Sequence, residues 1–307
     1  MKKRIQNRLA ESRFAFPVMI IYGLAVWLGA GTVAEGAYLQ FVFFVASTLL
    51  MMMLNNTNSL IRIYSRMVSC SFVAMTCAAT FLFSSLESCA TCMCFILFYL
   101  SLLRSYQDKR APGIAFYSFA CLGIASLFFV QILYFVPFLW ILMASNMMAL
   151  THRMFWATVL GLVMPYWFAV GYYVVTNQFD AFIDHFAELA QFEPLLQYEA
   201  LDIHRIATFG LVVLLAVIGI IHYMRNSYLD KIRTRMIFEM FITVDILSFV
   251  FIILQPQHFD NLLPIIIVNT SCLFAHYVAL TRTWLTNVTF IVMCLATLGL
   301  TIFNLMP

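Results

Sequence analysis

Long apolar runs without charge limit what this chain can fold into. Several windows of about 18 residues or more carry no Asp, Glu, Lys or Arg, which is the length that a helix needs to cross the hydrocarbon of a membrane. Mean hydropathy is +0.93 and 64% of the residues are hydrophobic. The runs are continuous instead of alternating, which excludes a membrane β-barrel. We therefore predict an all-α polytopic bundle that forms one transmembrane domain over residues 1–307.

Charge clusters and turn residues divide the chain into about eleven helices, with ten to twelve allowed. The expected spans are 14–33, 38–54, 67–85, 90–104, 113–130, 133–150, 154–175, 207–224, 237–254, 265–281 and 285–305. The division around residues 126–140 is the weakest, because only Gln131 and Pro137 mark a turn there. The basic start of the chain is typical of a signal peptide, but the apolar run that follows is too long, so we expect a retained first helix.

Basic residues predict the orientation of the bundle, because Lys and Arg in short loops mark the cytoplasmic side. With the N-terminus inside, sixteen of the seventeen Lys and Arg fall on the inner side, and only Arg205 lies outside. The inner set is Lys2, Lys3, Arg4, Arg8, Arg13, Arg62, Arg66, Arg104, Lys109, Arg110, Arg153, Arg225, Lys231, Arg233, Arg235 and Arg282. We predict a multi-pass protein of a bacterial inner membrane with a cytoplasmic N-terminus and an external C-terminus.

One segment collects much of the negative charge. Residues 176–206 hold six of the fourteen acidic residues and form the one long external loop of the predicted topology. Apolar residues recur in the loop at helical spacing, and Glu193 with Pro194 is a natural helix start. We expect two short amphipathic helices at the outer interface, which anionic lipid would not attract because both are acidic.

Polar side chains at membrane depth are the first candidates for a site, because burying them there is costly. Glu239 is close enough to the inner loop to pair with Arg233 or Arg235. Asp245 has no basic neighbour within a turn, and Asn269 and His276, seven residues apart, project from one face of their helix. The three could form a proton or cation relay, or a polar contact that holds helices together, with Asp245 bonded to Asn269, to His276 or to a Ser or Thr on another helix.

A second candidate site lies at the predicted outer mouth, where His204 and Arg205 end the acidic loop and His258 and Asp260 lie in QPQHFDNLLP. These four side chains either meet over one external cavity or are solvated loop residues.

The sequence lacks the motifs of several common chemistries. Cys89, Cys92 and Cys94 in SCATCMC lack the second Cys or His pair that a zinc site needs, so we expect no metal and interpret them as packing residues. No phosphate-binding Gly-rich loop, HExxH or GxSxG is present. The basic residues are scattered over small loops, which argues against nucleic-acid binding. No cofactor can be assigned.

The segments LSLLRSYQDKRAPGIAFYSFACLGIASLFFVQILYFVPFLWILM and GLVMPYWF, within residues 95–175, resemble an uncharacterised family of multi-pass inner-membrane proteins from Bacteroidota-type bacteria. LLPIIIVNTSCLFAHY fits the same pattern more loosely. That resemblance implies a helical membrane fold and no assigned activity.

The same run, preceded by LNNTNSLIRIYSR, is similar in layout to the GT-C membrane glycosyltransferases, which use polyprenyl-phosphate sugar donors. The resemblance implies an acidic catalytic residue in the first external loop, where the candidate is Glu35. Such enzymes usually have a long first loop with more than one acid, and this loop is short.

Three functions are compatible with these features. The first is a subunit or accessory protein in cell-envelope assembly, with the bilayer and an envelope protein as partners. The second is a GT-C-like enzyme, or a degenerate relative, that acts on a polyprenyl-linked lipid. The third is a secondary transporter with a polar site at Asp245, Asn269 and His276.

Overall fold

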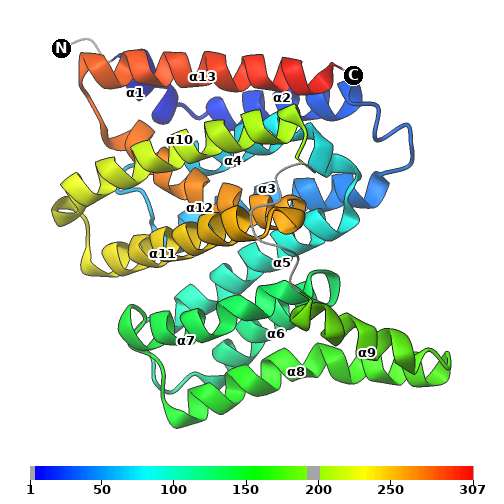
Figure 1. Cartoon of the computed structure of the whole chain (residues 1–307). Coiled ribbons are helices and arrows are strands. Elements are labelled where there is room, and N and C mark those ends of the chain that lie inside the picture. The colour runs from blue at the N-terminus through cyan, green and yellow to red at the C-terminus, as the bar shows by residue number, and fades with distance from the viewer. Residues whose placement is uncertain (1–3, 192–200, 307) are drawn as a thin grey trace.

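The computed structural model describes residues 4–191 and 201–306, and it contains only helices and connecting turns in those residues (Figure 1). The helices are α1 (Ile5–Ala10), α2 (Ala15–Gly29), α3 (Tyr38–Asn58), α4 (Met67–Ala78), α5 (Leu86–Leu102), α6 (Pro112–Phe128), α7 (Val136–Ser145), α8 (His152–Val175), α9 (Phe179–Ala187), α10 (Ile203–Asn226), α11 (Ile232–Leu254), α12 (Phe259–Leu280) and α13 (Trp284–Leu305). Seven described helices (α3, α5, α8 and α10–α13) are long and apolar enough to cross a membrane, and four shorter apolar helices accompany them. The predicted all-helical membrane fold is confirmed at this level.

Each predicted span overlaps an α-helix, but two of the spans also contain a 3-10 helix. The segment predicted as 133–150 is a 3-10 helix, η3 (Val130–Phe135), followed by the short α7. The segment predicted as 67–85 changes from α4 to a 3-10 helix, η1 (Thr80–Ser84). Short 3-10 segments are frequent at helix ends and as connectors, and η1 and η3 lie in such places, between α4 and α5 and between α6 and α7.

The connecting segments alternate between two ends of the bundle. We call the end that carries most of the arginines the basic end. Two hydrogen bonds connect its segments: Arg62 donates to the Leu229 carbonyl, and Arg4 donates to the Arg282 carbonyl. The opposite end, called the acidic end, holds the segment before α10, and Asn304 near the C-terminus donates there to the Ala78 carbonyl. This alternation agrees with the predicted loop positions.

Helix α12 is the centre of the bundle. Its most apolar 18-residue window is 100% buried, whereas the corresponding window of α8 is 17% buried. Helices α4, α5, α10 and α11 pack around α12, as Figure 1 shows for α10 and α11. Because α12 is covered on all sides by protein, its polar residues must find partners inside the bundle.

Close helix packing joins α6 to α8. A Cβ added at Gly161 would lie 2.4 Å from the Phe116 carbonyl oxygen, and one at Gly123 would lie 2.7 Å from the Leu162 carbonyl oxygen. Both distances are too short for a side chain, so the two glycines allow the backbones to approach each other.

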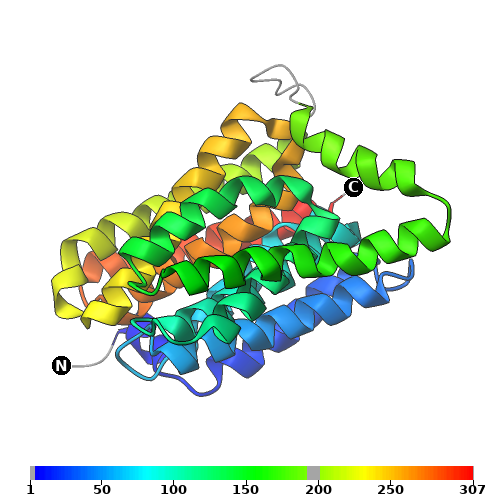
Figure 2. The same ribbon diagram turned by 90° about the horizontal axis from the view of Figure 1, so that it is seen from below.

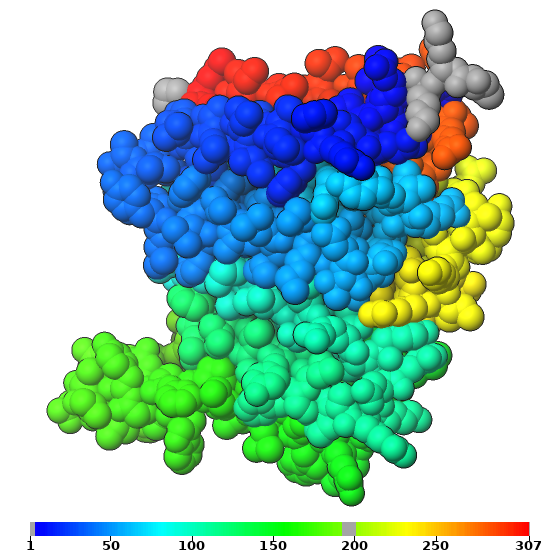
Figure 3. All heavy atoms as spheres, turned by 180° about the vertical axis from the view of Figure 1, so that it is seen from behind, coloured from blue at the N-terminus to red at the C-terminus, as the bar shows by residue number. Residues whose placement is uncertain are grey.

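The hairpin of α8 and α9 projects from the rest of the molecule at the acidic end (Figures 2 and 3). Helix α9 is the first of the two amphipathic helices predicted in the acidic segment. The second was predicted to begin at Glu193 and Pro194, which lie outside the described residues.

Candidate functional site

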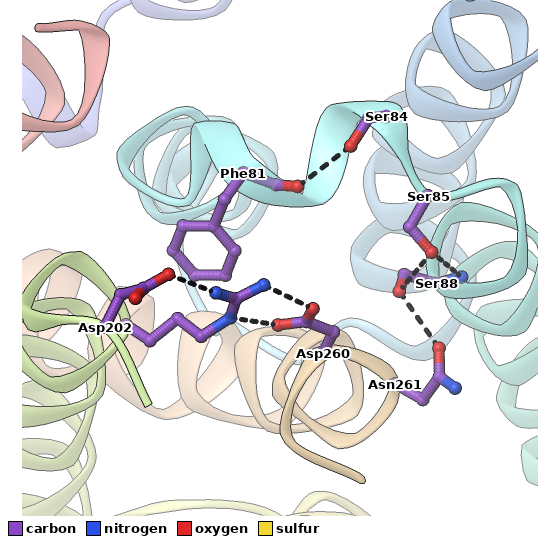
Figure 4. Close-up of polar contacts among 8 residues, drawn as sticks. Phe81, Ser84, Ser85, Ser88, Asp202, Asp260 and Asn261 are labelled. Atoms are coloured by element: carbon purple, nitrogen blue, oxygen red, sulfur yellow. Dashed lines mark hydrogen bonds and ion pairs between the residues drawn. The ribbon is translucent and has the colours of Figure 1, made fainter. Parts of the chain in front are cut away.

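Arg205 is the centre of a polar cluster at the acidic end, and Figure 4 labels its partners Phe81, Asp202 and Asp260. Its guanidinium donates two hydrogen bonds of 2.9 Å to the carboxylate of Asp260 and one of 2.7 Å to Asp202. The cation also lies 5.3 Å from the centre of the Phe81 ring. Arg205 thus holds the first turns of α10 and α12 against η1, and its planar fork suits a paired carboxylate.

A second set of hydrogen bonds lies beside this cluster (Figure 4). The Ser85 side chain accepts from the backbone N–H of Ser88 and so caps the start of α5. The Ser88 hydroxyl in turn donates to the side-chain oxygen of Asn261, at 3.0 Å. The start of α5 is thereby tied to the start of α12.

The two histidines predicted at this mouth do not join Arg205. His204 Nδ1 is 2.9 Å from Asn304 Oδ1, and the His204 ring stacks on Phe303 of α13. His258 lies among the rings of Phe129 and Phe251. Arg205 and Asp260 are in direct contact, whereas His204 faces α13, because consecutive residues of a helix point in different directions.

Asp245 is fully buried midway along α11. The Thr270 hydroxyl of α12 donates to Asp245 Oδ2 at 3.1 Å, and Asp245 Oδ1 has no hydrogen-bond partner among the described residues. Asn269, the neighbour of Thr270, accepts a 2.7 Å hydrogen bond from the Tyr99 hydroxyl of α5. These contacts join α11, α12 and α5 at the middle of the bundle, as interhelical polar contacts do in membranes.

His276 does not belong to this central group, which corrects the prediction that grouped it with Asp245 and Asn269. His276 Nε2 is 2.9 Å from Asp230 Oδ2, and Asp230 lies in the connection between α10 and α11 at the basic end. Both side chains are almost fully buried, with exposed fractions of 1% and 3%. Seven residues along a helix are roughly 10 Å, enough to move His276 from the centre of the bundle to its end.

Aromatic rings surround His276. Tyr223, Phe238 and His222 all lie with ring centres 4.9 to 5.5 Å from it. Arg62 Nη1 is 4.0 Å from Asp230 Oδ1 and faces the same carboxylate from the α3–α4 connection. The cluster joins the α3–α4 and α10–α11 connections to helix α12 at the basic end, which is consistent with a structural role.

Three further predicted residues have different surroundings from those expected. Glu239 accepts from the Asn146 side chain at 3.1 Å, while Arg233 donates to Asn58 and to the Leu103 carbonyl. Among the described residues, Glu239 therefore forms the expected ion pair with neither Arg233 nor Arg235. Glu35 is exposed on the α2–α3 connection.

The cysteines of SCATCMC pack within the bundle. Cys92 and Cys94 are buried in α5, and Cys89 and Cys92 line a small cavity of about 30 Å³ with Trp27 and Phe83. Within residues 4–191 and 201–306, no three His, Cys, Asp or Glu side chains are arranged to hold a metal ion.

Helix α9 presents one acidic and one aromatic face. Asp180 and Asp184 of α9, and Glu188 directly after it, recur every four residues and are exposed. On the other face, the ring centres of Phe186 and Tyr166 are 4.9 Å apart. His185 Nε2 lies 3.0 Å from the Ser126 carbonyl oxygen, and the Tyr134 hydroxyl donates to the Leu189 carbonyl just beyond α9. The aromatic face thus fixes α9 to α6 and α8 and leaves the carboxylates outside.

No protein-family profile, no curated protein and no solved structure matches this chain. The resemblances to a Bacteroidota membrane family and to the GT-C layout therefore stay predictions.

Sequence reasoning missed the residues that complete these clusters. Tyr99 and Asp230 were not singled out, although each is the partner of a residue that was, and Thr270 was expected only as an unspecified Ser or Thr of another helix. Asn304, which contacts His204, Thr208 and the Ala78 carbonyl, was missed as well. The signal for Asn304 was available, because an amide in the last turn of an apolar helix needs a partner.

Proposed function

We propose that the protein is an accessory subunit of a cell-envelope assembly in a bacterial inner membrane, with its N-terminus in the cytoplasm and its acidic end outside. The observation that supports this function is the acidic face of α9, which the aromatic face of the same helix directs away from the bundle. In this proposal the α8–α9 hairpin binds a basic surface on the external part of a partner protein.

Charge and shape both favour a protein partner. No Lys or Arg occurs between residues 154 and 204, so no cation of the segment itself neutralises the acids of α9. Anionic headgroups repel acidic helices, so the outer face of α9 is poorly suited to the membrane surface. Complementary charge mainly accelerates association and selects the partner.

The hairpin also carries exposed aromatic residues that a partner helix could cover. Trp167, Phe168 and Tyr172 on α8 are 77%, 67% and 63% exposed. Lipid can cover such residues too, but aromatic side chains are also enriched in protein interfaces. We assign the aromatic face of α8 to contacts within the membrane and the acids of α9 to the contact outside it.

The other two functions receive less support. A GT-C-like enzyme needs a carboxylate at a cavity that admits a lipid-linked sugar, and Glu35 is exposed on the short connection between α2 and α3. A transporter needs a polar site that water or substrate can reach, and Asp245 is fully buried.

Photocrosslinking in cells tests the proposal. A photoreactive amino acid at exposed Ala181 or Ala187 should give a discrete crosslinked protein band in the wild-type chain. The double variant Asp180→Asn/Asp184→Asn should lose most of that band while reaching the membrane in normal amounts.

The matched control is Glu35→Gln/Glu87→Gln, which removes two exposed acids at the same end and should leave the band unchanged. An equally strong band in the α9 variant, or crosslinks to lipid alone in the wild-type chain, would refute the proposed subunit role.

A further inference from the structure

An apolar groove runs along the side of the bundle beside α2 and α13, which lie next to each other in Figure 1. Its volume is about 570 Å³, within the range of small-molecule sites. Buried Met75, Leu215 and Phe274 line its floor, and exposed Val18 and Leu298 line its rim. A groove of this size and polarity accepts a hydrocarbon chain.

The groove begins at the basic end and stops partway across the bundle. Leu9, Phe14 and Met67 line it near the basic end. Tyr22 lines its far part, and the Tyr22 hydroxyl is 2.8 Å from Thr301 Oγ1, so this hydrogen bond ties α2 to α13 at that limit. The lining residues of α2 run from Ala15 to Tyr22, a rise of roughly 10 Å, and those of α13 run from Phe290 to Leu298, a rise of roughly 12 Å.

Arginines lie beside the residues that line the start of the groove. Arg8 precedes Leu9, Arg13 stands between Ser12 and Phe14, and Arg66 precedes Met67. Arg8 and Arg13 are exposed, and Glu11 is the one carboxylate between them. The segments at the start of the groove therefore carry a net positive charge.

Helix α1 is fixed across the basic end, so Arg8 does not sit on a loose terminus. The Gln6 amide donates to the Thr281 hydroxyl at 2.6 Å and to the Val278 carbonyl at 2.7 Å. The Asn7 amide donates to the Thr281 carbonyl at 2.8 Å. These three bonds attach α1 to the end of α12.

We propose that the groove is a binding site for an anionic diacyl phospholipid of the leaflet on the basic side, with one acyl chain along the groove and the phosphate beside Arg8 and Arg13. The positive charge at the start of the groove selects the anionic headgroup, as basic pockets between transmembrane helices do. The tie between Tyr22 and Thr301 closes the far part of the groove, and its limited length suits an acyl chain better than a long polyprenyl chain. This site is independent of the proposed role of α9.

Native mass spectrometry of the full chain in detergent tests the site. Phosphatidylglycerol and phosphatidylcholine with identical acyl chains are titrated separately, and undecaprenyl phosphate is added as a competitor. The wild-type chain should bind phosphatidylglycerol more tightly than phosphatidylcholine. Arg8→Gln/Arg13→Gln should weaken phosphatidylglycerol binding roughly tenfold, because each surface arginine contributes a few-fold in affinity. Ala74→Phe, which fills the groove, should weaken both phospholipids.

Two matched controls separate the site from general effects. Lys109→Gln/Arg110→Gln removes two exposed cations of the basic end away from the groove, and Ala296→Phe adds the same ring at an exposed position of α13 outside it. Both should bind phosphatidylglycerol like the wild-type chain, and size-exclusion chromatography checks that every variant is folded. Equal binding of the two phospholipids would overturn the headgroup assignment. Unchanged binding in a folded Ala74→Phe variant would overturn the groove, and stronger binding of undecaprenyl phosphate would overturn the diacyl ligand.

Discussion

The guanidinium of Arg205 and the carboxylate of Asp260 share two hydrogen bonds of 2.9 Å, which join the first turn of α10 to the first turn of α12. Arg205 is also the one cation of the chain that the sequence places on the outer side. It neutralises two acids there, Asp202 and Asp260, so its position follows from its partners.

Replacing Arg205 by Gln should lower the free energy of unfolding by roughly 1 to 2 kcal/mol, because the paired bonds are strong but a quarter of the side chain is exposed to solvent. Thermal unfolding in detergent measures the change. In a double-mutant cycle, adding Asp260→Asn should cost less than it does alone. Fully additive losses would contradict a direct pair.

Removing one partner of the buried pair of His276 and Asp230 should lower the free energy of unfolding more than replacing Arg205 does. Asp230→Ala leaves His276 buried without its partner, so we expect a loss of roughly 3 kcal/mol in the free energy of unfolding. Asp108→Ala removes an exposed carboxylate of the same end and should have little effect. Equal melting temperatures for the two variants would show that the pair does not hold the connections together.

Gly161→Ala should destabilise the packing of α6 on α8, because the new Cβ would clash with the Phe116 carbonyl oxygen. Relieving such a clash costs roughly 1 to 3 kcal/mol. Gly171→Ala on the same helix meets nothing within 4 Å and should be neutral or slightly stabilising. The comparison of the two melting temperatures is the measurement, and equal effects would argue against close packing at Gly161.

Tyr99→Phe should lower the free energy of unfolding by roughly 1 kcal/mol, because Asn269 loses its hydrogen-bond donor from α5. Tyr117→Phe is the control, at a side chain that is 66% exposed, and should leave the free energy of unfolding unchanged. If unfolding does not distinguish the two variants, the bond between α5 and α12 contributes nothing measurable.

Orientation in the membrane can be tested by labelling. A cysteine at Ala190 should react with an impermeant maleimide added outside intact cells, and a cysteine at Lys109 should react only after permeabilisation. The wild-type chain, whose eight cysteines lie in helices, gives the background. The reverse pattern would invert the proposed topology and place α9 in the cytoplasm.

The sequence alone predicted the class of fold and the ends to which the connections belong. Uncharged runs and the positions of Lys and Arg are local properties of the chain, and both translate directly into helices and their direction. The contact between Arg205 and Asp260 was among the predicted alternatives for the same reason, because both residues belong to one end.

Only the tertiary structure decided which faces of the helices meet. Spacing of seven residues made Asn269 and His276 neighbours on one face, yet one pairs with Tyr99 and the other with Asp230. The central position of α12 and the groove beside α2 depend on how each helix is rotated and tilted against several others. Those rotations are set by packing between residues far apart in the chain, and an apolar helix that can be covered by lipid or by protein does not specify them through its own sequence.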